Sequence, residues 1–136
     1  SRLERILTNL LGNAIKFTER GGVTLNICRP ELDIVMDGGS LQARSAIAFA
    51  VSDSGVGIPK EALERIFAPF EQLEARTQRK YGGTGLGLSI SRSLVRMHGG
   101  ELWVASALGV GSTFKFTIPR TLAQVADLPA VRAAVR

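Results

Sequence analysis

The run Gly82-Gly83-Thr84-Gly85-Leu86-Gly87-Leu88 constrains this chain more than any other stretch. Four glycines in six residues open a segment, from about Gly85 to His98, whose apolar residues recur at helical spacing. Glycine lets backbone N–H groups approach a ligand closely, and the first turn of a helix presents unpaired N–H donors at the positive end of its dipole. The run therefore predicts a phosphate-binding turn, unless it is a glycine-rich connection without a ligand.

The two commonest phosphate-binding loops do not fit this run. A Walker A loop requires Lys and then Ser or Thr after its last glycine, but Gly87 is followed by Leu88 and Ser89. The dinucleotide fingerprint requires G-x-G-x-x-G after a strand. Here the last three glycines are spaced by single residues, and the preceding segment 78–81 is polar and basic. The run supplies no lysine of its own to a phosphate.

The composition is that of an ordinary globular domain. The 136 residues suffice for one domain with a sizeable core, and 45% of them are hydrophobic and 21% charged. No apolar stretch approaches the roughly 18–20 residues of a membrane span. We therefore expect a cytoplasmic domain without membrane contact of its own, although its parent protein could be membrane-anchored. The single Cys28 excludes an internal disulfide and is expected to be a buried thiol in a strand.

The net charge of +5 and the pI near 10.1 raise nucleic acid as a partner. Aromatic residues make up only 6% of the chain, and most of them are phenylalanines in apolar settings. The basic residues are spread out, apart from small groups at 76–80 and in the tail. A solvated surface with a few cations for a nucleotide accounts for this pattern, so we expect no nucleic-acid partner. Steeply salt-dependent DNA affinity would support the nucleic-acid alternative.

Apolar periodicity and glycine turns predict an α+β fold. Its expected form is a two-layer sandwich, in which a mixed, mainly antiparallel sheet lies under helices on one face. Residues 1–119 would form the domain, and 120–136 a C-terminal linker or tail. The predicted elements are, in order, a helix over 2–17, a strand over 23–28, a hairpin-like segment over 30–43, a strand over 45–51, a short helix over 59–66, a polar loop over 71–84, the helix over 85–98, and strands over 101–106 and 112–119.

A polar stripe on the first predicted helix is the first candidate for chemistry. At 100° per residue, Asn9, Asn13 and Lys16 fall within about 60° of one another, on a different face from the apolar residues. An asparagine carbonyl oxygen is a hard neutral ligand that suits Mg²⁺ alongside phosphate oxygens and waters. Lys16, near one turn further on, could meet a phosphate as a point charge. The alternative is a solvated helix face without a ligand.

The run Asp53-x-Gly55-x-Gly57 is the second candidate. An aspartate at the end of a buried strand needs a hydrogen-bond partner, and the amino group of adenine is a donor that a carboxylate accepts well. The two glycines allow a sharp turn and let a flat ring lie close to the backbone. The alternative is a plain β-turn with the aspartate as its first residue.

Together these runs resemble the ATP-binding catalytic domain of sensor histidine kinases, over roughly residues 1–119. The resemblance implies the Bergerat-type ATP-binding sandwich shared with gyrase-type topoisomerases and heat-shock ATPases. The run Phe70-Glu71-Gln72 is similar to versions common in hybrid kinases. The matching runs, in chain order, are Asn9-Leu-Leu-Gly-Asn13-Ala-Ile-Lys16-Phe17, Asp53-Ser-Gly55-Val-Gly57-Ile-Pro59, Ile66-Phe67-Ala-Pro-Phe70-Glu-Gln72, Gly83-Thr-Gly85-Leu-Gly87-Leu88 and Gly109-x-Gly111-Ser112-Thr113-Phe114.

The resemblance also implies roles for individual residues. Asn13 would coordinate Mg²⁺, with Asn9 beside it near the phosphates, and Lys16 would contact a phosphate. Asp53 would accept a hydrogen bond from the adenine amino group, and segment 71–84 would form a lid over ATP. The other implied ATP-binding residues are Phe17 flanking the nucleotide, Gly55, Gly57 and Ile58 around the adenine, Lys80 and Tyr81 in the lid, Gly83, Thr84, Gly85, Leu86, Gly87 and Leu88 along the phosphates, and Thr113 beside the adenine.

The activity implied by the resemblance is transfer of the γ-phosphoryl group of Mg-ATP to a histidine. That histidine would lie on a separate dimerisation domain outside this chain, and a response regulator receiver domain would act downstream. No side chain of this chain need act as a nucleophile. Two alternatives stay open. One is an ATP hydrolase of the same fold, in which a glutamate would stand at the position of Asn9. The other is a non-catalytic ATP-binding or interaction module.

Overall fold

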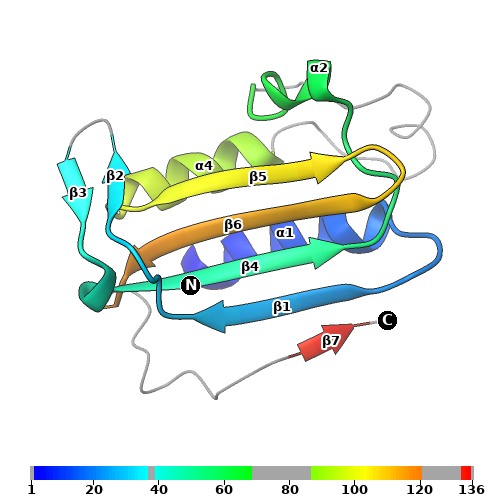
Figure 1. Ribbon diagram of the computed structural model, residues 1–136. Coiled ribbons are helices and arrows are strands. Elements are labelled where there is room, and N and C mark those ends of the chain that lie inside the picture. Colours follow the sequence, from blue (N-terminus) through cyan, green and yellow to red (C-terminus); the bar gives the residue numbers. More distant parts are fainter. Residues whose placement is uncertain (1, 37–38, 69–86, 121–132, 136) are drawn as a thin grey trace.

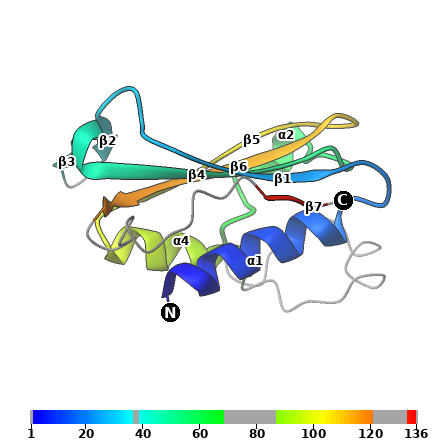
Figure 2. The ribbon, with the colours of Figure 1, turned by 90° about the horizontal axis from the view of Figure 1, so that it is seen from below.

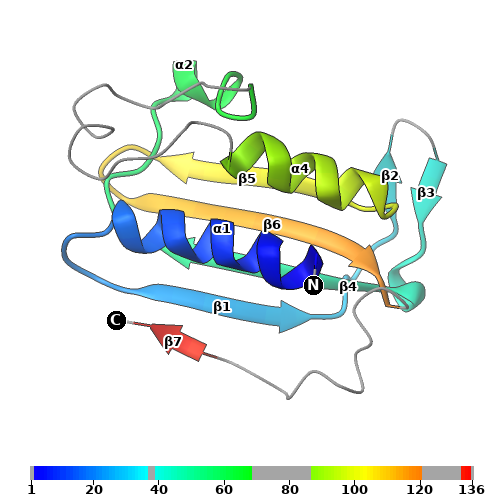
Figure 3. The same cartoon turned by 180° about the vertical axis from the view of Figure 1, so that it is seen from behind.

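The computed structural model describes residues 2–36, 39–68, 87–120 and 133–135. They form two layers (Figures 1 and 2), in which helices α1 (Arg2–Lys16) and α4 (Gly87–Met97) pack against one face of an antiparallel sheet. Figure 3 looks onto this helical layer and shows α1 and α4 side by side. The predicted α+β two-layer sandwich is confirmed.

The main sheet has the strand order β5-β6-β4-β1-β7, and each neighbouring pair in it is antiparallel. Four of its strands match the predicted ones to within two residues. The fifth, β7, lies in the segment 120–136 and pairs with β1, although the sequence pattern predicts no strand there. The strands are β1 (Val23–Cys28), β4 (Ala46–Asp53), β5 (Glu101–Ala107), β6 (Gly111–Pro119) and β7 (Ala133–Val135).

Smaller elements flank the sheet. The strands β2 (Ile34–Met36) and β3 (Gly39–Leu41) pair as a separate antiparallel hairpin, as expected for part of the segment 30–43. A single 3-10 turn, η1 (Ala43–Ser45), leads from it into β4. Helix α2 (Lys60–Leu63) lies beside β5 at the edge of the sheet (Figure 1), and it ends three residues before the predicted end.

Helix α1 faces the sheet with the apolar stripe that its spacing predicts. Ile6, Leu10 and Ala14 are buried because they recur at intervals of four residues along one side of the helix. Three flanking leucines pack against the same core, namely Leu3, Leu7 and Leu11.

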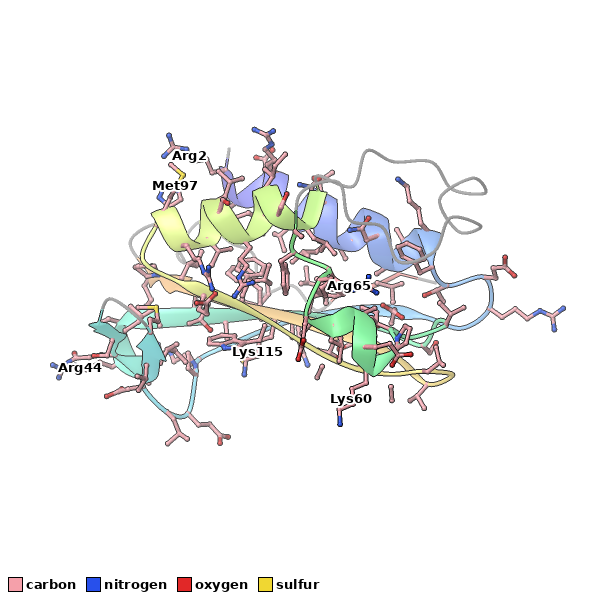
Figure 4. All side chains as sticks on the ribbon, turned by 90° about the horizontal axis from the view of Figure 1, so that it is seen from above. Arg2, Arg44, Lys60, Arg65, Met97 and Lys115 are labelled. Carbon is pink, nitrogen blue, oxygen red and sulfur yellow. The ribbon has the colours of Figure 1, made fainter. Side chains whose placement is uncertain are left out.

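One residue expected on the core face of α4 lies elsewhere. The apolar spacing predicts Leu86, Ile90, Leu94 and Met97 for that face. Leu94 does pack against the core, whereas Met97 is 70% exposed and points away from the sheet in Figure 4; Leu86 lies outside the described residues. The buried residues are Ser91 and Val95. Met97 lies two residues beyond Val95, which is about 200° around the helix, so the two cannot share a face.

Two phenylalanines form the centre of the core. Phe49 on β4 and Phe116 on β6 are directly paired across the strands, fully buried, and stacked with ring centroids 4.8 Å apart. Their side chains point toward the helical layer, since the alternating residues Ile47 and Val51 on β4 and Ile118 on β6 belong to the same buried cluster.

The apolar settings of Phe67 and Phe70 favour a place in the core for both, and Phe67 joins the core from the segment after α2. Its ring meets that of Phe114 edge to face, with centroids 6.5 Å apart, and the guanidinium carbon of Arg92 on α4 lies 4.6 Å from the centroid of the Phe67 ring. The Nε of Arg92 is 3.8 Å from the carboxylate of Glu101. Phe70, which was also expected in the core, lies outside the described residues.

The expectation of a buried Cys28 is wrong. Cys28 is exposed because β1 alternates: Val23 and Leu25 point into the core, and the even-numbered residues Thr24, Asn26 and Cys28 point to the open face of the sheet. Counting from the buried Val23 would have given the correct side.

Candidate nucleotide-binding site

A pocket lies between the two layers, at the end of the sheet where β4 ends and β6 begins. Among its described lining residues are one carboxylate, one side-chain amide and one hydroxyl, and most of the rest are apolar. Such a lining, with a few converging polar groups, is typical of a small-molecule site. The described lining residues are Asn13, Ala14, Phe17, Asp53, Val56, Gly57, Ile58, Leu88, Ser112 and Phe114.

The polar stripe of α1 divides between the pocket and the neighbouring helix. Asn13 is half-buried and lines the pocket. Asn9 instead turns its amide nitrogen toward α4, where Nδ2 lies 3.2 Å from the Oγ of Ser91 and 3.5 Å from the carbonyl oxygen of Gly87. Lys16 ends the helix on the exposed surface, three residues after Asn13. The three residues therefore share a side of α1 but not the same surroundings.

Asp53 is the carboxylate of the pocket, and its position follows from the alternation of β4. It continues the inward series of Phe49 and Val51 and stands opposite Ser112 of β6. Burial raises the pKa of Asp53 above its ordinary value of 3.8. Two backbone N–H groups oppose this shift by donating to the carboxylate, that of Gly55 at 2.9 Å and that of Ser112. The net result is a partly desolvated carboxylate that lines the pocket.

The loop after Asp53 needs its glycines for close packing. A Cβ on Gly55 would overlap the carbonyl oxygen of Phe17, at the end of α1. Gly57 has a φ of +76°, and a Cβ there would overlap the carbonyl oxygen of Ala107. The loop is thus held against α1 on one side and against the β5–β6 turn on the other, which places Ile58 in the pocket wall.

Thr113 does not join the pocket. Its Oγ1 lies 2.9 Å from the Oγ of Ser52, and it shares the outer face of β6 with Lys115, whose side chain points away from the helices in Figure 4. Successive residues of a strand face opposite sides, so Ser112 and Phe114 line the pocket instead. Thr113, expected beside the adenine, thus lies on the face of the sheet away from the pocket, and the alternation with the inward Phe114 and Phe116 is the signal in the sequence for that side.

The glycine run is only partly within the described residues. Gly87 is the first residue of α4, and Leu88 lines the pocket. The whole predicted lid 71–84 lies outside the described ranges. So do the other expected ATP-binding residues of this part of the chain, which are Lys80, Tyr81, Gly83, Thr84, Gly85 and Leu86.

The donor set of the pocket suits a metal that arrives with a phosphate. Within the described ranges, no group of three or more His, Cys, Asp or Glu side chains could hold a metal ion alone. Mg²⁺ commonly takes only one or two protein ligands and completes its shell with phosphate oxygens and waters. Asn13 offers a hard amide oxygen from the helical layer, whereas Asp53 comes from the sheet. A single amide oxygen as metal ligand, that of Asn13, is therefore compatible with Mg²⁺ bound to a nucleotide.

The sequence matches a known family over residues 1–122, described as histidine kinase-, DNA gyrase B- and HSP90-like ATPase. The chain belongs to this family. Its ATPase-type domain is the two-layer sandwich described above. The pocket holds residues from four of the five runs that carry the resemblance, those that contain Asn13, Asp53, Leu88 and Ser112.

Relatives of this family domain are histidine kinases. Hybrid signal transduction histidine kinase B of Dictyostelium discoideum is 47% identical over 118 residues, which is 87% of this chain and 6% of that protein. Sensor histidine kinase AruS of Pseudomonas aeruginosa is 47% identical over 123 residues, which is 90% of this chain and 12% of that protein. The chain thus spans a small part of the relatives that it matches.

Solved structures give the same result. Full-length ShkA, crystallised in complex with AMPPNP, is 39% identical with a TM-score of 0.64, and the match covers 87% of this chain and 21% of ShkA. The catalytic domain of histidine kinase ThkA, in a nucleotide-free form, is 33% identical with a TM-score of 0.61 and covers 87% of this chain. As for membranes, none of the helices in the described part of the chain combines the length and the apolar character that a membrane span requires.

Proposed function

We propose that this chain binds Mg-ATP in the pocket between α1 and the sheet and donates the γ-phosphoryl group to a histidine of a separate dimerisation domain. The observation that carries the proposal is the partly desolvated carboxylate of Asp53, which lines a largely apolar pocket together with Asn13 from the helical layer. Membership of the family and the AMPPNP complex of ShkA support the choice of nucleotide. Residues 1–119 would form this catalytic unit.

In this proposal residues of the sheet and its loop bind the base, and residues of helix α1 bind the triphosphate. The carboxylate of Asp53 accepts a hydrogen bond from the adenine amino group, and apolar side chains such as Val56 and Leu88 cover the ring. Asn13 faces the phosphates and holds Mg²⁺, which supplies positive charge against the phosphate oxygens. Lys16 adds a cation from the exposed end of α1. The chain then contributes positioning and charge neutralisation, as phosphoryl transfer requires, and no nucleophile.

The residue at position 9 favours transfer over hydrolysis. A hydrolase of this fold would use a glutamate there to activate water. Asn9 has an amide, which cannot take a proton at neutral pH, and its nitrogen already donates toward Ser91 and Gly87 of α4. The similarity to histidine kinases supports a histidine presented by a partner domain as the acceptor, with a receiver domain as the next recipient in a two-component pathway.

The experiment is calorimetry of the 136-residue chain with AMPPNP, with and without Mg²⁺, followed by a transfer assay. In that assay a dimerisation domain carrying the phosphoacceptor histidine is added as a separate chain, and acid-labile phosphate on it is measured. We expect binding that Mg²⁺ strengthens and phosphate on the added domain. Absence of AMPPNP binding at millimolar concentration would refute the proposal. Release of phosphate without labelling of the added domain would favour the hydrolase.

The Asn13→Ala variant tests the metal assignment within the same experiment. It should keep AMPPNP binding in the absence of Mg²⁺ but lose the strengthening that Mg²⁺ brings. The matched control is Asn26→Ala, which removes the same side chain from the exposed side of β1. A wild-type response to Mg²⁺ in Asn13→Ala would exclude Asn13 as the ligand.

A further inference from the structure

Ser106 on β5 has a hydroxyl with three polar neighbours, which is more than its half-buried position in a strand requires. Its Oγ lies 2.8 Å from the backbone nitrogen of Ile58, 2.9 Å from the carbonyl oxygen of Gly111 and 2.7 Å from the Oγ of Ser112. Two of these neighbours, Ile58 and Ser112, line the pocket. The hydroxyl thus connects the loop after Asp53 with the strand that faces it.

The hydrogens of this network can be assigned by counting. A serine hydroxyl has one proton to donate and two lone pairs to accept with. The N–H of Ile58 can only donate, so it occupies one lone pair of Ser106. The carbonyl oxygen of Gly111 can only accept, so it takes the proton. The second lone pair remains for Ser112, whose hydroxyl must then donate to Ser106 if all three contacts are hydrogen bonds.

This assignment fixes what Ser112 offers to a ligand. With its proton directed at Ser106, the Ser112 oxygen has only lone pairs left for the pocket, where it stands opposite Asp53 in the strand register. The end of the pocket then presents two acceptors, a carboxylate and a hydroxyl oxygen. An adenine edge, with its amino group, supplies a donor to such a pair. A 6-oxopurine carries an oxygen in place of that amino group, and its one donor on this edge is the ring N1–H, so at least one of the two acceptors would face an acceptor.

We propose that Ser106 is a positioning residue for base selectivity: it holds the Ser112 hydroxyl as an acceptor, so that the pocket prefers adenine to 6-oxopurine nucleotides. The inference rests on the proposed nucleotide site. The β5–β6 turn does not depend on Ser106 for its attachment to the loop, because Gly109 N–H also donates to the carbonyl oxygen of Val56 at 2.7 Å. Loss of the hydroxyl should therefore leave the fold intact.

The test compares ATP with inosine triphosphate, both with Mg²⁺, by calorimetry on the full chain. For Ser106→Ala we expect the ATP preference to fall by about fivefold, the effect of one lost hydrogen bond, through weaker ATP binding. Ser106→Thr, which keeps a hydroxyl, should restore the preference. In a Ser112→Ala background, Ser106→Ala should change the preference no further. The control is Ser52→Ala, which breaks the Ser52–Thr113 hydroxyl pair on the outer face of the same sheet and should leave the preference unchanged.

Two results would overturn the inference. One is an unaltered ATP preference in a folded Ser106→Ala variant, and the other is an equal loss of affinity for both nucleotides, which would mark a purely structural role. If the wild-type chain bound neither nucleotide, the proposed function itself would fail, which is a separate outcome. Circular dichroism and thermal unfolding of each variant establish that it is folded before binding is measured.

Discussion

Asn9 on α1 and Ser91 on α4 join these two helices through a hydrogen bond of 3.2 Å from the Asn9 amide to the Ser91 hydroxyl. Ser91 is fully buried, so its hydroxyl meets this amide in the interface between α1 and α4. The contact turns the amide nitrogen of Asn9 toward α4, so its carbonyl oxygen, which lies in the same plane on the other side of the Cβ–Cγ bond, points elsewhere.

Removal of this hydroxyl should cost stability. We expect Ser91→Ala to lower the free energy of unfolding by about 1 kcal/mol relative to its control, because the Asn9 amide loses a partner in a half-buried place. The control is Ser93→Ala, on the exposed side of α4; both substitutions gain the same helix propensity. Urea denaturation measures the difference, and equal stabilities of the two variants would contradict the role of the contact.

Neutralising Asp53 should weaken nucleotide binding. Asp53→Asn replaces one carboxylate oxygen by a donor, which meets the adenine amino group with a second donor. We expect at least a tenfold weaker affinity for AMPPNP, or about 1.4 kcal/mol, measured by calorimetry. Glu61→Gln, which neutralises an exposed carboxylate of α2, is the matched control and should bind as the wild type does. Wild-type affinity in Asp53→Asn would remove the carboxylate from base recognition.

The same substitution should change the pH dependence of stability. Burial raises the pKa of Asp53 in the folded chain, so the folded state keeps this proton to a higher pH than the unfolded state does. The free energy of unfolding should therefore decrease as the pH rises from about 3.8 through the raised pKa. Asp53→Asn lacks this decrease. Denaturant unfolding at pH 3.5 and pH 7 should show the variant gaining on the wild type at the higher pH, and a change in the opposite direction would contradict the assignment.

Two glycines should respond to alanine in opposite ways. Gly57→Ala should lower the free energy of unfolding by more than about 1 kcal/mol, since a positive φ and the carbonyl oxygen of Ala107 both oppose a side chain there. Gly12→Ala should raise it by about 0.5–1 kcal/mol, because this helical position has open space around it. Thermal unfolding of both variants tests the pair. A Gly57→Ala variant as stable as the wild type would show that the loop can shift away from β5.

Periodicity predicted the parts of the fold where one face is buried. The stripe of α1 and the alternation of β4 identify Ala14 and Asp53 as inward, and with them two walls of the pocket. The structure differs from expectation where a shift of one or two residues changes the side. Thr113 lies on the outer face of β6, because adjacent strand residues face opposite ways, and Met97 is exposed, because it lies about 200° around α4 from the buried Val95.

The connections made by Ser106 could not be predicted in this way. Its partner Ile58 is 48 residues distant along the chain, and a serine in a strand has no local pattern that distinguishes a bridging hydroxyl from an exposed one. Likewise, nothing in the composition of α4 marks Ser91 as the partner of Asn9. Such contacts exist only once α1, α4 and the sheet are packed together.

The pocket takes its walls from both layers: α1 and α4 on one side, and β4, its loop and β6 on the other. A ligand in the pocket contacts both the helices and the sheet, so the two layers cannot separate without release of the ligand. Ligand affinity and the free energy of unfolding are therefore linked. A ligand that binds only the folded chain raises that free energy with the logarithm of its free concentration relative to its Kd. Nucleotide binding should therefore stabilise the helical layer and the sheet together rather than one loop alone.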